Sequence, residues 1–194
     1  MKHAIALVVL AMLTGAVSAK PGAPVHKGVA TCASSLCHGS ARDKPDSPLL
    51  RDEYLTWQRH DAHSGAFQTL RNEQSRRIAR RLNLGPAHEA KVCLDCHTDH
   101  VPPEQRGTQF QLSDGVGCES CHGGSEHWLQ SHTGDDVDHA ENVDNGLVPL
   151  ERAGVRARVC QDCHDGGDDR FAGHDILGAG HPRLPCELMS YSMR

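Results

Sequence analysis

The sequence predicts a mainly α-helical protein with long loops, and three observations support that fold class. Segments with helical spacing of apolar residues are short and are separated by glycines and prolines. Aromatic residues make up only 4% of the chain, and the mean hydropathy is −0.51. Four clusters of cysteine and histidine recur along the sequence. Because the side chains supply so little apolar surface, we expect the groups bound by these clusters to form the core.

Three of the clusters follow the pattern C-x-x-C-H, which is the signature for covalent attachment of c-type haem. In such sites the two cysteine thiols become thioethers on the porphyrin, and the next histidine binds the iron. A fourth cluster has four residues between its cysteines, so the chain must bulge to bring both sulfurs to one porphyrin edge. The sequence therefore predicts a compact multihaem cytochrome c fold whose core is formed by four covalently bound haems c. The predicted attachment cysteines and proximal histidines are Cys32, Cys37 and His38; Cys93, Cys96 and His97; Cys118, Cys121 and His122; and Cys160, Cys163 and His164.

Structural zinc is the main alternative, because two C-x-x-C pairs can close a tetrahedral site. A histidine directly follows the second cysteine in all four clusters, however, and haem requires this histidine whereas zinc does not. Disulfides are a second alternative in an exported chain. A C-x-x-C bridge would close a very small ring and would leave the repeated histidine unexplained. We therefore favour haem at all four clusters.

The first 19 residues have the pattern of a secretory signal peptide, with a short positive start, an apolar core and small residues before Ala19. We expect cleavage after Ala19, which leaves one domain of residues 20–194. An uncleaved membrane anchor is the alternative, although the apolar run is too short to span a bilayer comfortably. Because haem c is attached outside the cytoplasm, the predicted location is the periplasm.

Between the first and second clusters, the spacing of apolar residues predicts a helix over residues 50–70 that carries His60 and His63 on one side. Residues 72–84 are a predicted basic helix, whose arginines either pair with haem propionates or form a solvated face. Pro86 is in a position to open a further helix that leads into the second cluster.

Beyond the third cluster, residues 134–146 are rich in glycine, aspartate and asparagine and predict a long exposed loop. A short helix over about residues 149–160 is expected to lead into the fourth cluster. Glycines then predict a flexible approach to His181. Cys186 is the unpaired ninth cysteine and fits a small buried residue in an apolar C-terminal stretch, in which a methionine ligand to iron is the weaker alternative.

Three stretches resemble the multihaem c-type cytochromes related to tetrahaem cytochrome c-554. They are Trp57-Gln-Arg-His-Asp-Ala-His-Ser-Gly-Ala-Phe67, Gly115-Val-Gly-Cys-Glu-Ser-Cys-His-Gly123 with Trp128 and His132 after it, and Gly180-His-Pro-Arg-Leu184. The third is similar to a motif of wider multihaem relatives. The spacing of the first cluster and the G-H-P-R-L run depart from the tetrahaem pattern.

The resemblance implies that two histidines cross between segments to become sixth ligands. His63 would bind the haem at His122, and His132 would bind the haem at His38. A sixth ligand must approach the face of the porphyrin opposite the proximal histidine, so this crossing would tie neighbouring haems into a packed pair.

The remaining ligands are assigned less directly. His181, in the G-H-P-R-L run, is the predicted ligand of the haem at His164, and His174 is the leading choice for the haem at His97. The resembled tetrahaem protein leaves one haem five-coordinate, so an open iron at His97 stays the alternative. The other histidines considered are predicted to be surface or supporting residues: His60, His88, His100, His127 and His139.

The net charge is −5, and removal of Lys2 with the signal peptide makes it −6. An acidic chain disfavours nucleic acid and anionic membranes as partners, and it is not expected to be an integral membrane protein. We expect redox partner proteins, with association with other cytochromes as a further possibility. The predicted function is periplasmic electron transfer without enzymatic activity. The alternatives are an enzyme that acts on a small nitrogen or sulfur compound at an open haem, and a subunit of a larger multihaem complex.

Overall fold

The computed structural model describes residues 22–42, 50–134, 136, 138–167, 170 and 173–183. The predicted signal peptide and Cys186 lie outside these residues. Within them the secondary structure is helical, apart from one isolated parallel bridge between His26 and Arg106. The mainly α-helical class with long loops is therefore confirmed. Among the described helices, none has the length and apolar character needed to cross a membrane.

The helical elements are short. In chain order they are α1 (Val29–Cys32), α2 (Glu53–His60), η1 (Ala62–Gly65), α3 (Ala66–Thr69), α4 (Glu73–Arg81), α5 (Lys91–His97), η2 (Pro103–Gln105), η3 (Leu112–Asp114), α6 (Cys118–His122), α7 (Leu129–His132), α8 (His139–Asp144), α9 (Ala153–Gln161), η4 (Asp162–Gly166) and α10 (His174–Gly178).

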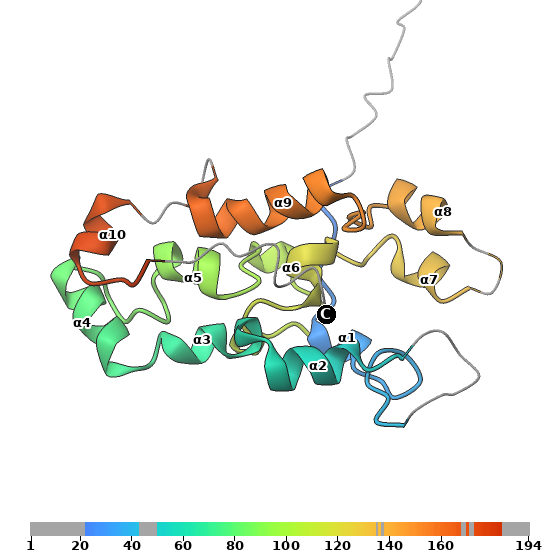
Figure 1. Ribbon diagram of the computed structural model, residues 1–194, viewed down its shortest axis with the longest axis horizontal. Helices are drawn as coiled ribbons and strands as arrows, with labels where there is room; N and C mark the ends of the chain where they lie inside the picture. The colour runs from blue at the N-terminus through green and yellow to red at the C-terminus, as the bar shows by residue number, and fades with distance from the viewer. Residues whose placement is uncertain are drawn as a thin grey trace, which may run out of the picture.

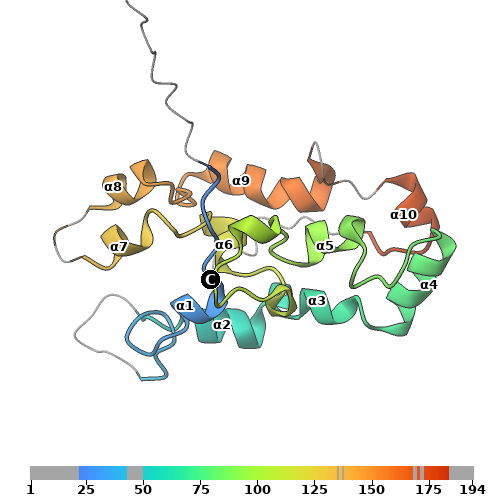
Figure 2. The ribbon, with the colours of Figure 1, turned by 180° about the vertical axis from the view of Figure 1, so that it is seen from behind.

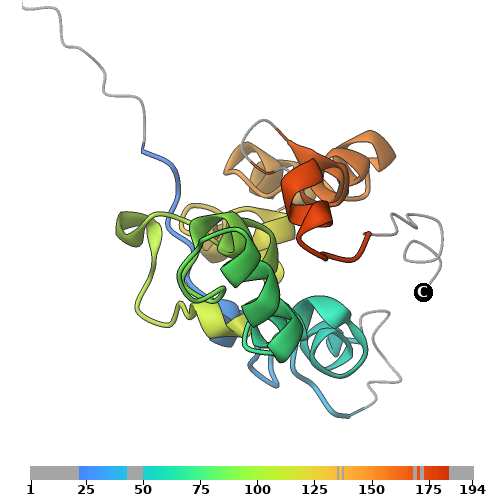
Figure 3. The same cartoon turned by 90° about the vertical axis from the view of Figure 1, so that its left-hand side faces the viewer.

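These elements form an elongated molecule (Figure 1). α2 and α3 run along one long side, α8, α9 and α10 run along the other, and α5 and α6 lie between them. α4 and α10 stand together at one end, while α7 and α8 form the opposite end, as the reverse view also shows (Figure 2). Seen along the long axis, α4 and α5 lie between α10 and α2 (Figure 3). The arrangement spreads the four cysteine clusters along the length of the molecule.

The helix predicted over residues 50–70 is interrupted at Asp61. α2 ends there because Asp61 adopts an extended conformation, with φ −102° and ψ 123°. The Asp61 carboxylate then accepts the backbone N–H of His63 and starts the 3₁₀ turn η1, which continues into α3. His60 stays exposed on α2 while His63 is half-buried, so the two histidines do not share one face.

The predicted basic helix is confirmed as α4. The Asn72 side chain caps it by accepting the Ser75 N–H at 2.8 Å, and it ends before Asn83, whose φ of 54° is incompatible with a continuing helix. Pro86, by contrast, does not open a helix. It begins a turn, and α5 starts only at Lys91.

The stretch 134–146 is not wholly a loop, since α8 occupies residues 139–144. The Asp138 side chain accepts the N–H of Glu141 at 2.9 Å and caps the start of α8. The glycine-rich and acidic composition of the stretch predicted a loop instead. The helix predicted over about 149–160 is present as α9. It begins four residues later, at Ala153, and carries the first cysteine of the fourth cluster.

The apolar core of the described chain is small. One cluster of buried residues joins α3, α4 and α5 and consists of Phe67, Leu70, Ala79, Ala87 and Leu94. Only Ser125 has less than 2% of its side chain exposed, so no large side chain of the described residues is completely enclosed. The predicted shortage of apolar side-chain packing is therefore seen in the structure.

Candidate functional site

The four clusters present their cysteines on different local structures. Two of them lie wholly within single short helices, α5 and α6, which places the cysteines about one turn apart. In the fourth cluster Cys160 belongs to α9, and Cys163 with His164 lies in the π-helical turn η4 that follows. None of the eight cysteines is in a disulfide.

The first cluster has the predicted bulge. Cys32 ends α1, and the chain then turns so that the backbone N–H of His38 reaches the Cys32 carbonyl at 3.2 Å. The extra residues make two bonds to the Ser34 carbonyl, from the N–H groups of Cys37 and Gly39, each at 2.9 Å. This loop returns Cys37 and His38 to the end of α1, so the longer spacing still yields a compact cluster.

Cysteines of different clusters are neighbours. The Cys118 thiol is hydrogen-bonded to Cys32, so the first and third clusters adjoin. The Cys96 thiol is bonded to Cys163, so the second and fourth clusters adjoin. Cys121 lies close enough to Cys160 and Cys163 of the fourth cluster for their charges to raise its pKa. The clusters therefore follow one another in the order first, third, fourth, second.

These contacts set the acidity of the free thiols. The hydrogen bond from Cys96 lowers the pKa of Cys163 to about 6, whereas the same bond raises the pKa of Cys96. Burial raises the pKa of Cys121 to about 11. Before any attachment reaction, Cys163 is thus an acidic thiol, and the thiolate is the reactive form of cysteine.

Three pairs of histidine rings face one another across the clusters. His38 and His132 have ring centroids 5.9 Å apart and planes at 10°. His63 and His164 are 6.0 Å apart with planes at 77°, and His97 and His181 are 6.1 Å apart with planes at 74°. We refer to these as the three ring pairs; each contains one histidine of a cysteine cluster and one from elsewhere in the chain.

Four of these imidazoles are oriented by a bond at Nδ1. The Nδ1 of His38 lies 2.9 Å from Glu53, and that of His63 lies 2.8 Å from Asp61. The Nδ1 of His97 lies 3.0 Å from the Ala66 carbonyl, and that of His181 lies 2.7 Å from the Pro182 carbonyl. A histidine that donates its Nδ1–H to such an acceptor carries its unprotonated nitrogen at Nε2, which is the usual arrangement for a metal ligand.

Electrostatics favour neutral imidazoles at several of these positions. Burial lowers the pKa of His97, and burial together with the neighbouring His38 lowers the pKa of His132. Burial and the proximity of His38 and His132 likewise lower the pKa of His122. The neutral ring is the form that binds iron.

The ring pairs can be compared with the predicted ligand assignments. His132 faces His38, as the resemblance implied. His63 faces His164 rather than His122, because the break at Asp61 directs it toward η4. His181 faces His97, which is the place predicted for His174. His174 itself is exposed at the start of α10.

Some of the histidines predicted to be surface or supporting residues are exposed, and others contact residues near the clusters. His60, His127 and His139 are exposed, and His88 packs edge-on against Phe67 at 6.5 Å. His100 supports the second cluster, because its Nδ1 contacts the carboxylate of Asp95, one of the residues between the cluster's cysteines, at 2.5 Å.

Two residues with clear roles were missed by the sequence analysis. Glu119, inside the third cluster, is a buried carboxylate whose oxygens accept three backbone N–H groups: Lys27 at 2.8 Å, Gly28 at 2.7 Å and Ser125 at 2.7 Å. His26 donates to Asp99 at 2.7 Å beside it. The positions between the cysteines of a C-x-x-C-H motif carry no pattern, and backbone donors leave no mark in the sequence, so no sequence signal pointed to Glu119.

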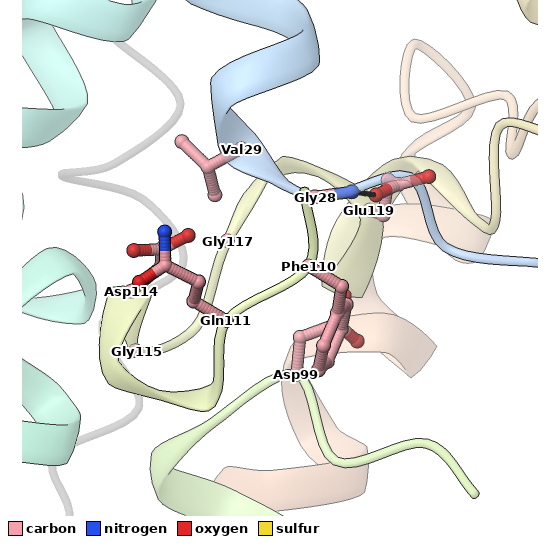
Figure 4. A pocket seen from close by; sticks show the side chains of 9 residues that line it. All are labelled: Gly28, Val29, Asp99, Phe110, Gln111, Asp114, Gly115, Gly117 and Glu119. Carbon is pink, nitrogen blue, oxygen red and sulfur yellow. Dashed lines mark hydrogen bonds between the residues drawn. The ribbon is translucent and has the colours of Figure 1, made fainter. Parts of the chain in front are cut away.

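The cavity at this place is not a cofactor pocket. Figure 4 shows Glu119 bonded to Gly28 at one side of a space of about 10 Å³, which is roughly the size of one water molecule. His26, Asp99 and Glu119 have donor atoms within 4.8 Å of one another, a separation that a metal ion could bridge. Because Glu119 is already saturated by backbone N–H groups and His26 by Asp99, we interpret the cluster as a brace between segments.

Glycine is required where His63 is fixed to the third cluster. The backbone N–H of Val116 donates to the His63 carbonyl at 3.1 Å, and Trp57 donates its indole N–H to the Val116 carbonyl at 3.0 Å. A Cβ at Gly115, which has a φ of 78°, would lie 2.5 Å from that His63 carbonyl. The Trp57 and Gly115 stretches singled out in the sequence thus meet in space and position His63.

The ring pairs fit bis-histidine ligation of iron. An imidazole nitrogen lies about 2.0–2.1 Å from a metal ion that it binds, so two rings on opposite sides of one ion have centroids roughly 6 Å apart. Each ring pair has this separation and belongs to a cluster with two cysteines that are not in disulfides. The donor set therefore matches haem c better than zinc, which would take the thiolates themselves as ligands.

Comparisons with known proteins agree with this chemistry. Residues 31–123, which include the first three clusters, match the family model for cytochrome c554 and c-prime. The chain is 35% identical over 98 residues to the C-type polyheme cytochrome OmcB of two Geobacter sulfurreducens strains. The match covers 44% of this chain and 11% of the relative, so the chain spans about a tenth of the length of the curated relatives it matches. No solved structure matches the chain significantly.

Proposed function

We propose that this chain, which belongs to the multihaem c-type cytochromes, is an exported electron-transfer protein that holds four haems c. The observation that carries the proposal is the set of three ring pairs at 5.9–6.1 Å. An iron with two histidine ligands has no open position for a substrate, so a site of this kind suits electron transfer rather than binding.

Each cluster contributes the same parts to the proposed cofactor sites. The eight cluster cysteines would attach the porphyrins, and His38, His97, His122 and His164 would be the proximal ligands. We propose His132, His63 and His181 as the opposite ligands at His38, His164 and His97. Haem bound at these positions supplies one-electron chemistry, in which iron alternates between the ferrous and ferric states.

The arrangement of the clusters supports a conducting role. Contacts between Cys32 and Cys118, between Cys121 and the fourth cluster, and between Cys96 and Cys163 make the four clusters continuous. Cofactors attached to such a row would be close neighbours, so an electron accepted at one end of the molecule could leave at the other. Redox partner proteins would dock at the ends.

Export follows from the cofactor and from the N-terminal pattern. Covalent haem attachment takes place outside the cytoplasm, and residues 1–19 have the pattern of a cleaved signal peptide. We therefore place the mature chain, residues 20–194, in the periplasm.

Mass spectrometry of the purified protein tests the haem count and the cleavage together. Four haems should add about 616 Da each to a chain that begins at Lys20. A mass increment corresponding to fewer than three haems would refute the proposal. A chain that retains residues 1–19 would contradict the cleavage alone.

A second function is favoured by one observation at the third cluster. Among the described residues, the ring pairs take up the histidines of the first, second and fourth clusters, whereas His122 is not in such a pair. If the iron at His122 has an open position, it could act on a small nitrogen or sulfur compound. Carbon monoxide distinguishes the two functions: a changed spectrum of the reduced protein supports the open site, and an unchanged one rejects it.

A further inference from the structure

Helix α4 carries a dense group of exposed positive charges in an acidic protein. Residues 71–81 contain Arg71, Arg76, Arg77, Arg80 and Arg81 against a single carboxylate, Glu73. The side chains of the central three arginines are each more than half exposed: Arg76 by 55%, Arg77 by 52% and Arg80 by 64%. We call these three residues the α4 arginine face.

Internal pairing does not neutralise this face. All three arginines approach the one carboxylate of Glu73, at 3.1 Å, 3.9 Å and 3.3 Å. One negative charge cannot balance three positive charges, and exposed ion pairs of this kind are weak. A positive excess therefore remains at the surface.

The spacing of the arginines opposes helix stability. Arg76 and Arg80 are four residues apart on the same side of α4, as are Arg77 and Arg81, and like charges at this spacing destabilise a helix. Charges of alternating sign along a helix face are typical of an ordinary solvated face. The repeated arginines therefore need a reason outside the helix itself.

The helix is fixed beside a ring pair. Ile78 and Ala79 are buried, so the opposite side of α4 is anchored in the protein. Arg81 donates to the Ala179 carbonyl at 2.9 Å, and Gln74 donates to the Gly180 carbonyl at 3.1 Å. Those two carbonyls immediately precede His181, which faces His97, and Figures 1 and 3 show α4 and α10 together at this end of the molecule.

We infer that the α4 arginine face is the docking surface for a redox protein whose contact face is rich in carboxylates. The inference rests on the proposed function, because it names the partner of the ring pair His97 and His181. A negatively charged partner would be attracted to this end although the whole chain is acidic, since local charge directs encounter more than net charge does. Haem iron held at His97 and His181 would give one electron to the oxidised acceptor in each encounter, so that the iron is oxidised and the acceptor reduced by one electron each.

The test compares two double variants of the haem-containing protein that lose the same net charge. Arg77→Gln/Arg80→Gln removes two charges from the α4 arginine face, and Arg59→Gln/Arg158→Gln removes two exposed charges elsewhere. The reduced proteins are mixed with ferricyanide, an anionic one-electron oxidant, and with the cation tris(phenanthroline)cobalt(III). Oxidation is followed in a stopped-flow instrument at several salt concentrations, with and without poly-L-glutamate.

We expect the α4 variant to react with ferricyanide about 3–10 times more slowly than wild type at low salt, with rates that converge near 1 M salt, where the screening length is only ~3 Å. The Arg59/Arg158 variant should stay close to wild type. Poly-L-glutamate should inhibit the wild type and the control variant but not the α4 variant. The cobalt complex should react with the α4 variant at least as fast as with wild type.

Three results would overturn the inference. Equal slowing of both variants would show an effect of net charge alone, and no slowing of the α4 variant would show that the face is not used. A shifted absorption spectrum or midpoint potential in the α4 variant would assign the arginines to haem propionates instead. The haem content, measured beforehand by mass, tests the proposed function separately. A protein with four haems can still show no difference between the variants, which would refute the docking surface alone.

Discussion

The two ends of the molecule hold their histidine pairs in different ways. At the α4 end, His97 lies in α5, which contributes Leu94 to the apolar cluster with Phe67 and Leu70, and the Nδ1 of His97 is bonded to a backbone carbonyl. At the α7 end, the side chain of His38 is 40% exposed and is bonded to a carboxylate. Leu36, in the bulge before His38, is 76% exposed. Apolar packing therefore supports His97 at the α4 end. At the α7 end polar contacts hold His38, while the buried Trp128 packs edge-on against His132 at 5.6 Å.

This difference has an electronic consequence for the proposed haems. A carboxylate at Nδ1 and access to water both favour ferric iron, because both stabilise the additional positive charge. The haem at His38 should therefore have a lower potential than the haem at His97. Electrons should accordingly run from the α7 end toward the α4 end, where the α4 arginine face lies.

The largest effect is expected for Glu119→Ala, which removes the polar brace between α6 and the segment before α1. Three backbone N–H groups lose their acceptor, and each unsatisfied buried donor costs about 1–3 kcal/mol, so the loss should reach several kcal/mol. Guanidinium unfolding of the haem-containing protein measures it. Glu126→Ala is the matched control, because Glu126 accepts only one exposed N–H, that of Val25. A change of about 0.5 kcal/mol or less, as for an ordinary surface substitution, would show that Glu119 is not a brace.

The next effect concerns the ring pairs, whose planes are nearly parallel at the α7 end and nearly perpendicular at the α4 end. His132→Ala should convert the haem at His38 to high spin and remove the ordinary rhombic low-spin signal from the electron paramagnetic resonance spectrum. His181→Ala should instead remove a low-spin signal with a large maximal g value. Each variant loses one of two axial ligands, so one haem in four should change. His60→Ala is the control, and a high-spin haem in that variant would contradict the assignment.

A smaller effect is expected for Glu53→Gln, which replaces the carboxylate at the Nδ1 of His38 with a neutral acceptor. A difference of about 1 kcal/mol between a charged and a neutral acceptor corresponds to roughly 40 mV for a one-electron couple. The potential of the haem at His38 should rise by about that amount. The difference in potential between the haems at His38 and His97 would then become smaller. Redox titration measures it, with Asp52→Asn as the control for the loss of a nearby charge. A lowered potential would refute the proposed gradient.

The sequence predicted the features that depend on local patterns but not all of those that depend on tertiary contacts. The clusters themselves and the helix that carries the arginines were predictable, because spacing and periodicity are local properties. The resemblance also implied that His132 faces His38, but the partners of His97 and His164 depend on tertiary contacts and were not predicted. His63 faces His164 only because Asp61 breaks the helix, and His181 faces His97 only because α4 binds the chain at Ala179 and Gly180. Glu119 was missed because its partners are backbone groups, two of which, those of Lys27 and Gly28, are distant in the sequence.

The smallest effect expected is a pH-dependent one at His26, which joins the N-terminal segment to the loop after α5 through Asp99. Burial by itself would lower the pKa of His26, but the hydrogen bond to Asp99 and the charges of Asp99 and Glu119 outweigh it, so the pKa is raised above its usual value. Folding therefore favours the protonated ring. The stabilisation is fully present below the unfolded pKa of about 6.5 and is lost as the pH rises through the raised pKa of the folded state.

The variant His26→Gln should remove this pH dependence. Relative to wild type, it should be less stable at mildly acidic pH, by on the order of 1 kcal/mol as for a single hydrogen bond, and the difference should shrink as the pH rises. Guanidinium midpoints of both proteins between about pH 5.5 and pH 8.5 measure it, a range that brackets the usual pKa of histidine. A difference that grows with pH would mean that His26 is neutral in the folded protein. In that case Asp99 would accept a hydrogen bond from a neutral ring, and the link between the segments would not depend on proton uptake.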